Sequence, residues 1–182
     1  MYFWYKLLTY ILQLIAPFYL FVRKLRKKEH PQRYKEKLSL TNLKRENGFL
    51  VWFHVASVGE AMSIISLIEG LEKDNKVNKI LITTITLSSS EVLKKKFVDS
   101  KKVVHQFLPL DITKFVEKFL NHWSPNLSIF IDSEIWPILI FEIKKRNIPL
   151  LLINGRLTKK SYSRWKIVKN FSKKIFEKFD LC

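Results

Sequence analysis

Glycine is scarce in this chain, which has only Gly48, Gly59, Gly70 and Gly155 among its 182 residues. So few glycines exclude the G-x-G-x-x-G and G-x-x-x-x-G-K-[ST] loops that bring backbone N–H groups against nucleotide phosphates. Nucleotide binding, if the protein performs it, must therefore use another motif or another domain.

Cysteine is scarcer still, because Cys182 is the only one. A single cysteine excludes an intrachain disulfide and any metal site built from cysteine thiolates. The four histidines, His30, His54, His105 and His122, also lack a metal-ligand spacing such as H-E-x-x-H. The sequence therefore predicts no metal site.

Acidic residues are outnumbered two to one by basic ones. Lys and Arg together number 33 and Asp and Glu 16, so the formal net charge is 33 − 16 = +17. Such an excess favours an anionic partner, which can be a nucleic acid, an acidic membrane leaflet or a phosphorylated substrate. No DNA- or RNA-binding motif accompanies the charge, so we expect no nucleic-acid partner.

Residues 1–22 are almost wholly apolar and aromatic, with Lys6 as the only charge. A helix over residues 2–22 is about 31 Å long, close to the roughly 30 Å hydrocarbon core of a bilayer. No small-residue cleavage site follows, which favours an uncleaved membrane-anchor helix over a signal peptide. The alternative is a core helix that packs beside the rest of the chain.

A basic linker is predicted for residues 23–48, which open with Arg23, Lys24, Arg26, Lys27 and Lys28. The positive-inside rule places this end of the anchor, and everything after it, in the cytoplasm. Basic residues are also attracted to the anionic headgroups of a membrane surface. Within the linker we expect one short helix over residues 33–38.

The remaining 134 residues, 49–182, alternate between apolar β-branched runs and amphipathic stretches. Strands are expected at 49–54, 79–84, 103–107, 127–131 and 149–153, and helices at 61–71, 88–97, 112–123, 136–146 and 158–178. Alternation of this kind predicts an α/β fold with a doubly wound parallel sheet, similar to a Rossmann domain. Residues 179–182 look like the beginning of a further strand, so we expect a piece of a longer architecture.

Three polar loops follow predicted strands and should meet at the carboxyl edge of the sheet, where open α/β folds bind ligands. Carboxylates there suit a general base, and arginine suits a phosphate or carboxylate of the substrate. The loops are Ser57-Val58-Gly59-Glu60, Asp132-Ser133-Glu134 and Asn154-Gly155-Arg156.

Each of these loops also has a structural interpretation. Glu60 can complement the helix dipole and complete a capping box with Ser57. Asp132 and Glu134 can cap the helix that follows them, and Arg156 can be a solvated surface residue. The sequence pattern leaves these alternatives open.

Other polar residues of the body have less specific patterns. Thr83, Thr84 and Thr86, with serines 88–90, can bind an anion at a helix start or can be strand and capping residues, with Ser88 opening the helix. His54, at a strand end, is predicted to be a hydrogen-bonded packing residue rather than a base.

Five motifs in this order resemble the amino-terminal half of the 3-deoxy-D-manno-octulosonic-acid (Kdo) transferases. They are WFHVASVGE, TTITLSSSE, VVHQFLPLD, IDSEIWP and LLLINGRLTKKSY, and the resemblance covers essentially the whole chain. It implies the amino-terminal domain of a GT-B glycosyltransferase, held by a single anchor at the cytoplasmic side of the cell inner membrane. It also implies inverting transfer of Kdo from CMP-Kdo to the tetraacyl disaccharide bisphosphate precursor of lipid A (lipid IVA), with no metal or other cofactor.

The resemblance also implies residue roles. Glu60 matches the general base of the family, in a loop that includes Ser57 and Gly59. Asp132 and Glu134 match the carboxylates of the family's E-x-E-x-W-P motif. The implied substrate-binding residues are Ser57, Gly59, Asp132, Glu134, Asn154 and Arg156.

The chain departs from the family pattern at several positions. Asp132 replaces a glutamate, Ser89 replaces a glycine, and Gly155 replaces an alanine. We expect the carboxyl-terminal domain, which carries most of the CMP-Kdo site in the family, to be missing from this chain, so residues 49–182 are expected to bind the acceptor. The alternative to an active transferase is therefore an inactive remnant, or a half-enzyme that needs a separately encoded carboxyl-terminal domain.

Overall fold

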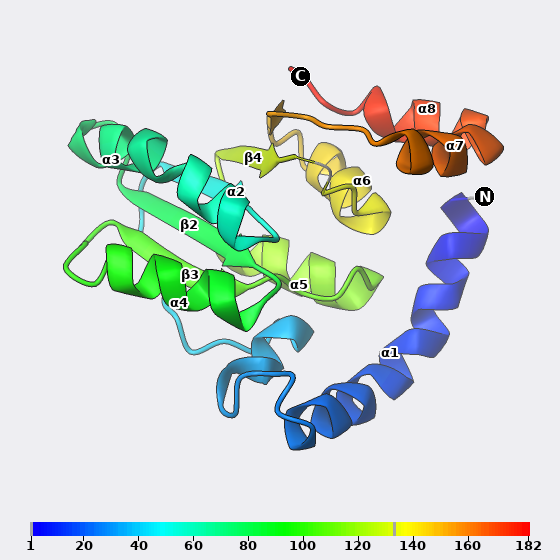
Figure 1. The fold of residues 1–182 in the computed structure, drawn as a ribbon, viewed down its shortest axis with the longest axis horizontal. Helices are drawn as coiled ribbons and strands as arrows, with labels where there is room; N and C mark the ends of the chain where they lie inside the picture. Colours follow the sequence, from blue (N-terminus) through cyan, green and yellow to red (C-terminus); the bar gives the residue numbers. More distant parts are fainter. Residues whose placement is uncertain (1, 133) are drawn as a thin grey trace.

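Five parallel strands form the centre of the protein in a computed structural model that describes residues 2–132 and 134–182 (Figure 1). The sheet order is β3-β2-β1-β4-β5, which is the Rossmann arrangement. All four strand pairings are parallel, so the predicted doubly wound sheet is confirmed. The strands are β1 (Leu50–His54), β2 (Lys79–Thr84), β3 (Val103–Phe107), β4 (Leu127–Ile131) and β5 (Leu150–Ile153).

Helices cover both faces of the sheet, because successive strand residues point to opposite sides. In β1, Trp52 packs with α5, α6 and α8 on one face, and Phe53 packs with α2, α3 and α4 on the other. Both side chains are fully buried. The helices are α2 (Val58–Ser63), α3 (Ile65–Lys73), α4 (Leu87–Lys96), α5 (Thr113–Trp123), α6 (Pro137–Lys145), α7 (Lys159–Ile167) and α8 (Lys169–Phe176).

The single helix predicted for residues 61–71 is wrong, because the helical segment begins at Val58 and breaks at Ile64. Ile64 has φ −97° and ψ −3°, and its side chain is buried in the core beneath α2 and α3. The Ser63 hydroxyl also donates to the Glu60 carbonyl at 2.8 Å, a local bond that competes with continuation of the helix.

The predicted helix over 158–178 is likewise two helices, broken at Val168 (φ −109°, ψ 40°). The Trp165 carbonyl accepts from the Val168 N–H at 3.2 Å and from the Ser172 hydroxyl at 3.1 Å, so α8 is tied to the last turn of α7. Ile175 of α8 is then fully buried against the sheet. The start predicted for the helix at 88–97 also shifts, since Thr86, not Ser88, caps α4 by accepting from the Ser89 N–H.

The short helix expected at 33–38 is present as the 3₁₀ helix η1 (Arg33–Leu38), and it covers the exposed edge of β3. The Arg33 guanidinium donates to the His105 carbonyl at 2.7 Å, and Glu36 accepts from the Phe107 N–H at 2.9 Å. Unpaired groups of an edge strand invite association with other chains. Residues of the basic linker therefore protect this edge of the sheet.

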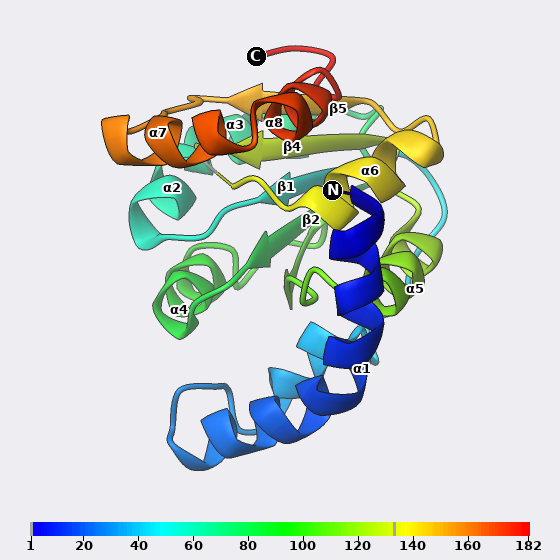
Figure 2. The same cartoon turned by 90° about the vertical axis from the view of Figure 1, so that its right-hand side faces the viewer.

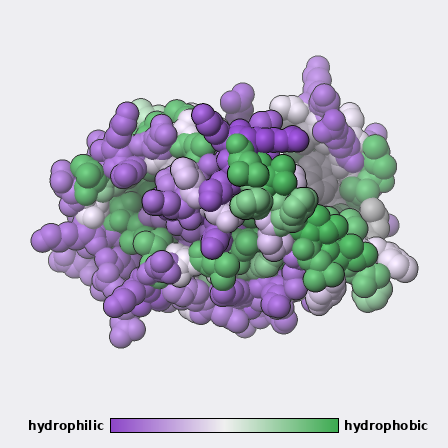
Figure 3. Space-filling model, turned by 90° about the horizontal axis from the view of Figure 1, so that it is seen from below, coloured by the Kyte–Doolittle hydropathy of each residue, from purple (hydrophilic) through white to green (hydrophobic). Residues whose placement is uncertain are grey.

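Helix α1 (Tyr2–Leu25) packs along the protein beside α5 and η1 (Figure 2). Tyr5 donates to Asp111 at 2.8 Å, and the hydroxyls of Thr9 and Thr113 lie 3.1 Å apart. In the described part of the chain, α1 is the one helix long and apolar enough to cross a membrane. Its outward side chains contribute to the apolar surface that is green in Figure 3.

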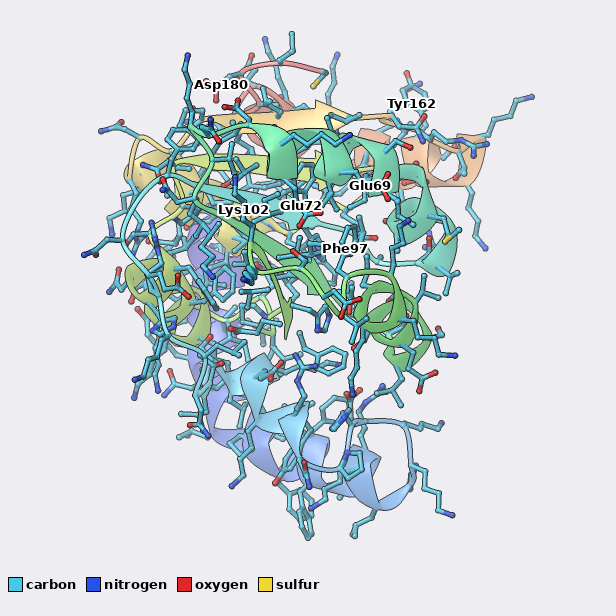
Figure 4. All side chains as sticks on the ribbon, turned by 90° about the vertical axis from the view of Figure 1, so that its left-hand side faces the viewer. Glu69, Glu72, Phe97, Lys102, Tyr162 and Asp180 are labelled. Carbon is cyan, nitrogen blue, oxygen red and sulfur yellow. The ribbon has the colours of Figure 1, made fainter. Side chains whose placement is uncertain are left out.

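The last residues lie along the free edge of β5, as the start of a sixth strand would. Leu181 forms a parallel bridge with Leu151, and the Leu152 N–H donates to the Leu181 carbonyl at 2.9 Å. Asp180 accepts from the Leu150 N–H at 2.7 Å and lies at the opposite end of the sheet from Tyr162 of α7 (Figure 4).

Candidate functional site

The three polar loops lie at the carboxyl ends of β1, β4 and β5, which are neighbours in the sheet. The strand order reverses between β1 and β4, because the chain builds β2 and β3 on one side of β1 and then returns to the other. Ligands of open α/β sheets bind in the crevice at such a reversal. Glu60 follows β1 and Glu134 follows β4, so both residues lie at this reversal, the region that we call the crevice.

Glu60 and Ser57 form the capping box that the sequence offered as one interpretation. The Ser57 hydroxyl oxygen accepts from the Glu60 N–H at 3.2 Å and caps α2. In return, the Glu60 carboxylate accepts from the Ser57 hydroxyl and from the Ala56 N–H, each at 2.7 Å. These two bonds fall on different oxygens, and each carboxylate oxygen has two lone pairs. Both oxygens of Glu60 therefore keep a lone pair with which a proton could be taken up.

Gly59 lies in the first turn of α2, between the two capping residues. A Cβ atom at this position would meet only the Ser57 Oγ, at 4.0 Å. Neither the backbone nor the packing of the described chain therefore requires glycine here, and its lack of a side chain leaves open space beside Glu60.

Glu134 is held by two donors on one of its oxygens. The Trp136 indole N–H donates to Oε2 at 2.8 Å, and the His54 Nε2 lies 3.4 Å from the same atom. Burial by itself raises the pKa of the Glu134 carboxyl, but the hydrogen bond and charge of His54 and the bond from Trp136 outweigh it and lower that pKa. Among the described residues, the other oxygen, Oε1, accepts no hydrogen bond.

His54 connects Glu134 to the interior of the sheet. Its side chain is fully buried, and its Nδ1 lies 3.0 Å from the Thr83 hydroxyl, which accepts from the Trp52 indole at 2.9 Å. The Thr83 hydroxyl donates to the Phe53 carbonyl at 3.3 Å, and His54 Nδ1 also lies 3.2 Å from the Thr83 carbonyl, so both imidazole nitrogens have a polar partner. His54 is therefore a hydrogen-bonded packing residue, as predicted, but its contact with Glu134 was not foreseen, because β1 and β4 are far apart in sequence.

Asp132, Asn154, Gly155 and Arg156 come together around a pocket of about 300 Å³ next to Glu134's loop. Asp132 and Asn154 both have left-handed backbones, with φ of 61° and 54°. Aspartate and asparagine adopt this conformation more readily than other non-glycine residues, so these residue types suit the turns after β4 and β5. A Cβ on Gly155 would come within 3.1 Å of Leu152 Cδ2, so the alanine typical of the family would need Leu152 to move slightly.

The cap of α6 comes from Asp111, not from Asp132 or Glu134. The Asp111 carboxylate accepts from the Ile138 N–H at 3.1 Å and from the Leu139 N–H at 2.8 Å. Burial raises the pKa of this carboxyl, and the hydrogen bonds from Leu139, Ile138 and Tyr5 oppose that rise. The Leu-Pro-Leu-Asp turn after β3 was the only available signal, and it did not reveal which helix Asp111 would reach.

The threonines at the end of β2 and just after it have structural partners in the folded chain. Thr83 and Thr84 are fully buried, and the Thr84 hydroxyl lies 2.9 Å from the His105 Nε2. Thr86 caps α4. Within residues 2–132 and 134–182, no group of three or more His, Cys, Asp or Glu residues is arranged to hold a metal ion.

Comparison with known proteins gives consistent matches. A family model described as 3-deoxy-D-manno-octulosonic-acid transferase (kdotransferase) matches residues 32–182. The chain is 39% identical over 183 residues to the 3-deoxy-D-manno-octulosonic acid transferase of Rickettsia bellii. This alignment covers 94% of this chain and 43% of the relative. It is 38% identical over 161 residues to a probable mitochondrial 3-deoxy-D-manno-octulosonic acid transferase of Arabidopsis thaliana, covering 88% of this chain and 36% of the relative.

The transferase of the same description from Haemophilus influenzae is 38% identical over 119 residues, which are 65% of this chain and 27% of the relative. The chain therefore spans less than half the length of each of these three relatives.

Proposed function

The chain belongs to the family of 3-deoxy-D-manno-octulosonic-acid (Kdo) transferases, and we propose that it forms the acceptor-binding part of such a glycosyltransferase. The reaction is transfer of Kdo from CMP-Kdo to the lipid A precursor lipid IVA, with inversion at the anomeric carbon, in lipopolysaccharide synthesis. The observation that carries this proposal is the family match over residues 32–182, which includes all three loops of the crevice.

Glu60 is the proposed general base. It takes the proton from the acceptor hydroxyl while that oxygen bonds to the anomeric carbon of Kdo, and the bond from this carbon to the phosphate of CMP breaks. Support comes from its place beside the reversal of strand order and from the lone pairs left on its oxygens. The start of α2 favours the negative charge of the carboxylate. Capping and proton uptake are therefore compatible.

The other loop residues are proposed to bind the acceptor sugar and its phosphates. Glu134 offers its Oε1 to a hydroxyl group, since its Oε2 is engaged by Trp136 and His54. Arg156 suits an anionic oxygen because guanidinium groups form strong charge-assisted hydrogen bonds. Asp132 and Asn154 line the same pocket as Arg156, while Ser57 and Gly59 shape the space beside Glu60.

A location at the cytoplasmic face of the cell inner membrane fits a lipid acceptor. Tyr5 of α1 donates to Asp111, and the Thr9 hydroxyl meets that of Thr113, so the apolar helix packs against the segment that follows the carboxyl end of β3. The basic residues from Arg23 to Lys28 follow α1 directly and suit an anionic leaflet. The acceptor could then reach the crevice while its acyl chains stay in the bilayer.

Donor binding is proposed to depend on a separate carboxyl-terminal domain. The chain lacks the glycine-rich loops that hold nucleotide phosphates and spans 43% of its Rickettsia bellii relative. The same observations favour a second candidate, an inactive remnant that keeps the fold and the membrane location but transfers no sugar.

A transfer assay separates the two candidates. The purified chain is incubated with CMP-Kdo and lipid IVA, alone and with the carboxyl-terminal half of the Rickettsia bellii relative. We expect transfer only with the added half, and Glu60→Gln should reduce it by about 100-fold or more, as loss of a general base does. Asp99→Asn, an exposed change before β3 and outside the five family motifs, is the matched control. No transfer in either mixture supports the remnant, and full activity of Glu60→Gln excludes the proposed base.

A further inference from the structure

We propose that α1 does not cross the bilayer but lies along its surface, docked on the protein on one side and immersed in lipid on the other. This inference rests on the membrane location proposed above and specifies how the membrane is bound. The hydropathy of the sequence alone favours a helix that crosses the bilayer, since α1 is long and apolar enough to span it.

The docking contacts of α1 extend over nearly its whole length. At its beginning, the Tyr2 ring lies 4.1 Å from that of Phe141, and Tyr5 donates to Asp111. Thr9, in the middle, is only 2% exposed and meets the hydroxyl of Thr113.

The second half of α1 is docked as firmly. Ala16 and Leu20 are buried in a cluster with Leu38, Ile112 and Phe115. After them, Arg23 donates to Glu29 at 2.6 Å, and Glu29 also pairs with Lys37 at 2.7 Å. The contacts therefore run from residue 2 to residue 23, a helix length of about 33 Å.

A docked α1 cannot span, because the segments beside it would enter the hydrocarbon with it. These neighbours include residues 108–112, which form no helix or strand, the 3₁₀ helix η1, and the charged groups of Asp111, Glu29 and Lys37. Irregular backbone in contact with lipid is not tolerated at that depth, and charges there are costly. Spanning would thus require α1 to leave the protein and expose the core cluster around Ile112 and Phe115.

The opposite face of α1 is suited to lipid. At 100° per residue, most of its exposed large apolar side chains occupy the side opposite Thr9, Ala16 and Leu20, and no charged residue interrupts them. Lys6 lies at the border and is partly buried. The side chains on this outward side are Phe3, Trp4, Leu7, Leu8, Tyr10, Ile11, Leu14, Phe18, Phe21 and Leu25. Leu12, Ile15 and Tyr19 are also exposed, but they line a pocket with residues 110–112 of the protein body.

Charge identifies an anionic bilayer as the partner of this face, rather than a second copy of the chain. Arg26, Lys27 and Lys28 are exposed directly after α1, and the whole chain carries +17. Two such basic chains repel each other, whereas anionic headgroups attract each of them. An apolar helical face bordered by basic residues is the arrangement of helices that lie in the membrane interface.

Disulfide trapping tests the docked state in vesicles of phosphatidylethanolamine and phosphatidylglycerol at 3:1. Cys182→Ser removes the only native thiol, and Thr9→Cys with Thr113→Cys then places two thiols where the hydroxyls are 3.1 Å apart. We expect the same yield of disulfide in vesicles as in detergent. Phe18→Cys with Thr113→Cys is the control, because Phe18 points outward, and it should not cross-link. A yield in vesicles that falls to the level of this control would overturn the inference.

Depth measurements provide a readout that does not depend on buried substitutions. A nitroxide spin label is attached to a single cysteine introduced by Phe3→Cys, Leu14→Cys or Phe21→Cys in the Cys182→Ser background. All three positions are exposed and lie on one side of α1. We expect three equal, shallow depths in the same vesicles. A deepest position at Leu14, with residue 3 at the far surface, would overturn the inference and leave the membrane location intact.

Failure of the chain to float with these vesicles would contradict both the inference and the membrane location. Coupling between nitroxides of two chains without lipid contact would show that a second copy covers the face, which also overturns the inference. None of these outcomes depends on sugar transfer, so they are independent of the proposed activity.

Discussion

The imidazole of His54 and the carboxylate of Glu134 meet across neighbouring strands, with Nε2 3.4 Å from Oε2. The two residues are 80 positions apart, yet the pairing of β1 with β4 makes them neighbours. His54 is fully buried and receives its own support from Thr83. The contact links the loop after β4 to the interior of the sheet and engages the Oε2 oxygen of Glu134.

Replacing His54 should raise the pKa of Glu134. In His54→Leu, the burial that disfavours the carboxylate persists while the hydrogen bond and charge of the imidazole are lost. Carboxyl ¹³C NMR of Glu134 over pH 3–7 measures the change. Trp136→Phe removes the other donor and should raise the same pKa. An unaltered Glu134 pKa in His54→Leu would mean that the two side chains do not interact.

Loss of the Ser57 cap should destabilise the protein, while loss of the Glu60 charge should not. Ser57→Ala removes the acceptor of the Glu60 N–H and should cost about 1 kcal/mol. Glu60→Gln keeps an oxygen that can accept from the Ala56 N–H, so we expect a change within about 0.5 kcal/mol. Urea unfolding in detergent measures both. A large loss in Glu60→Gln would show that its role in transfer cannot be separated from folding.

Asp111 should be among the most sensitive positions of the chain. Asp111→Ala leaves the N–H groups of Ile138 and Leu139 without their acceptor and removes the partner of Tyr5. We expect a loss of about 2 to 3 kcal/mol in the free energy of unfolding. Asp99→Ala, an exposed change before β3, is the matched control and should be nearly neutral. Equal effects of the two variants would contradict the capping role.

Acid should destabilise the protein through His105. Burial, with the nearby charges of Arg33 and His30, lowers the pKa of His105 from 6.5 to about 3. The unfolded chain therefore binds a proton at this residue as the pH falls below 6.5, whereas the folded chain does so only near 3. Between these limits, His105 should remove up to about 1.4 kcal/mol of stability per pH unit of acidification.

Unfolding free energies measured from pH 7 to pH 4 test this effect. His105→Gln has no group that titrates in the range, so its stability should fall less steeply with acid than that of the natural chain. Parallel curves for the two proteins would contradict the assignment.

Much of the fold could be predicted because its signals are local. The apolar run of β2 and the stretch predicted at 103–107 have the observed bounds, since each is a short β-branched segment between polar ones. Helix breaks at Ile64 and Val168 could not be predicted, because they depend on which side chains the sheet buries. The three site loops were found for the same local reason, as polar residues that follow strands.

By itself, the sequence determined the order of strands and helices, the apolar length of α1, the excess of positive charge and the placing of Glu60 at a helix start. These properties follow from composition and from the periods of strand and helix. Tertiary structure alone decided that Glu134 meets His54, that Asp111 caps α6, and that α1 lies docked along the protein. The reason is physical: each depends on contacts between residues distant in sequence, which exist only once the sheet order and the packing of helices on it are fixed.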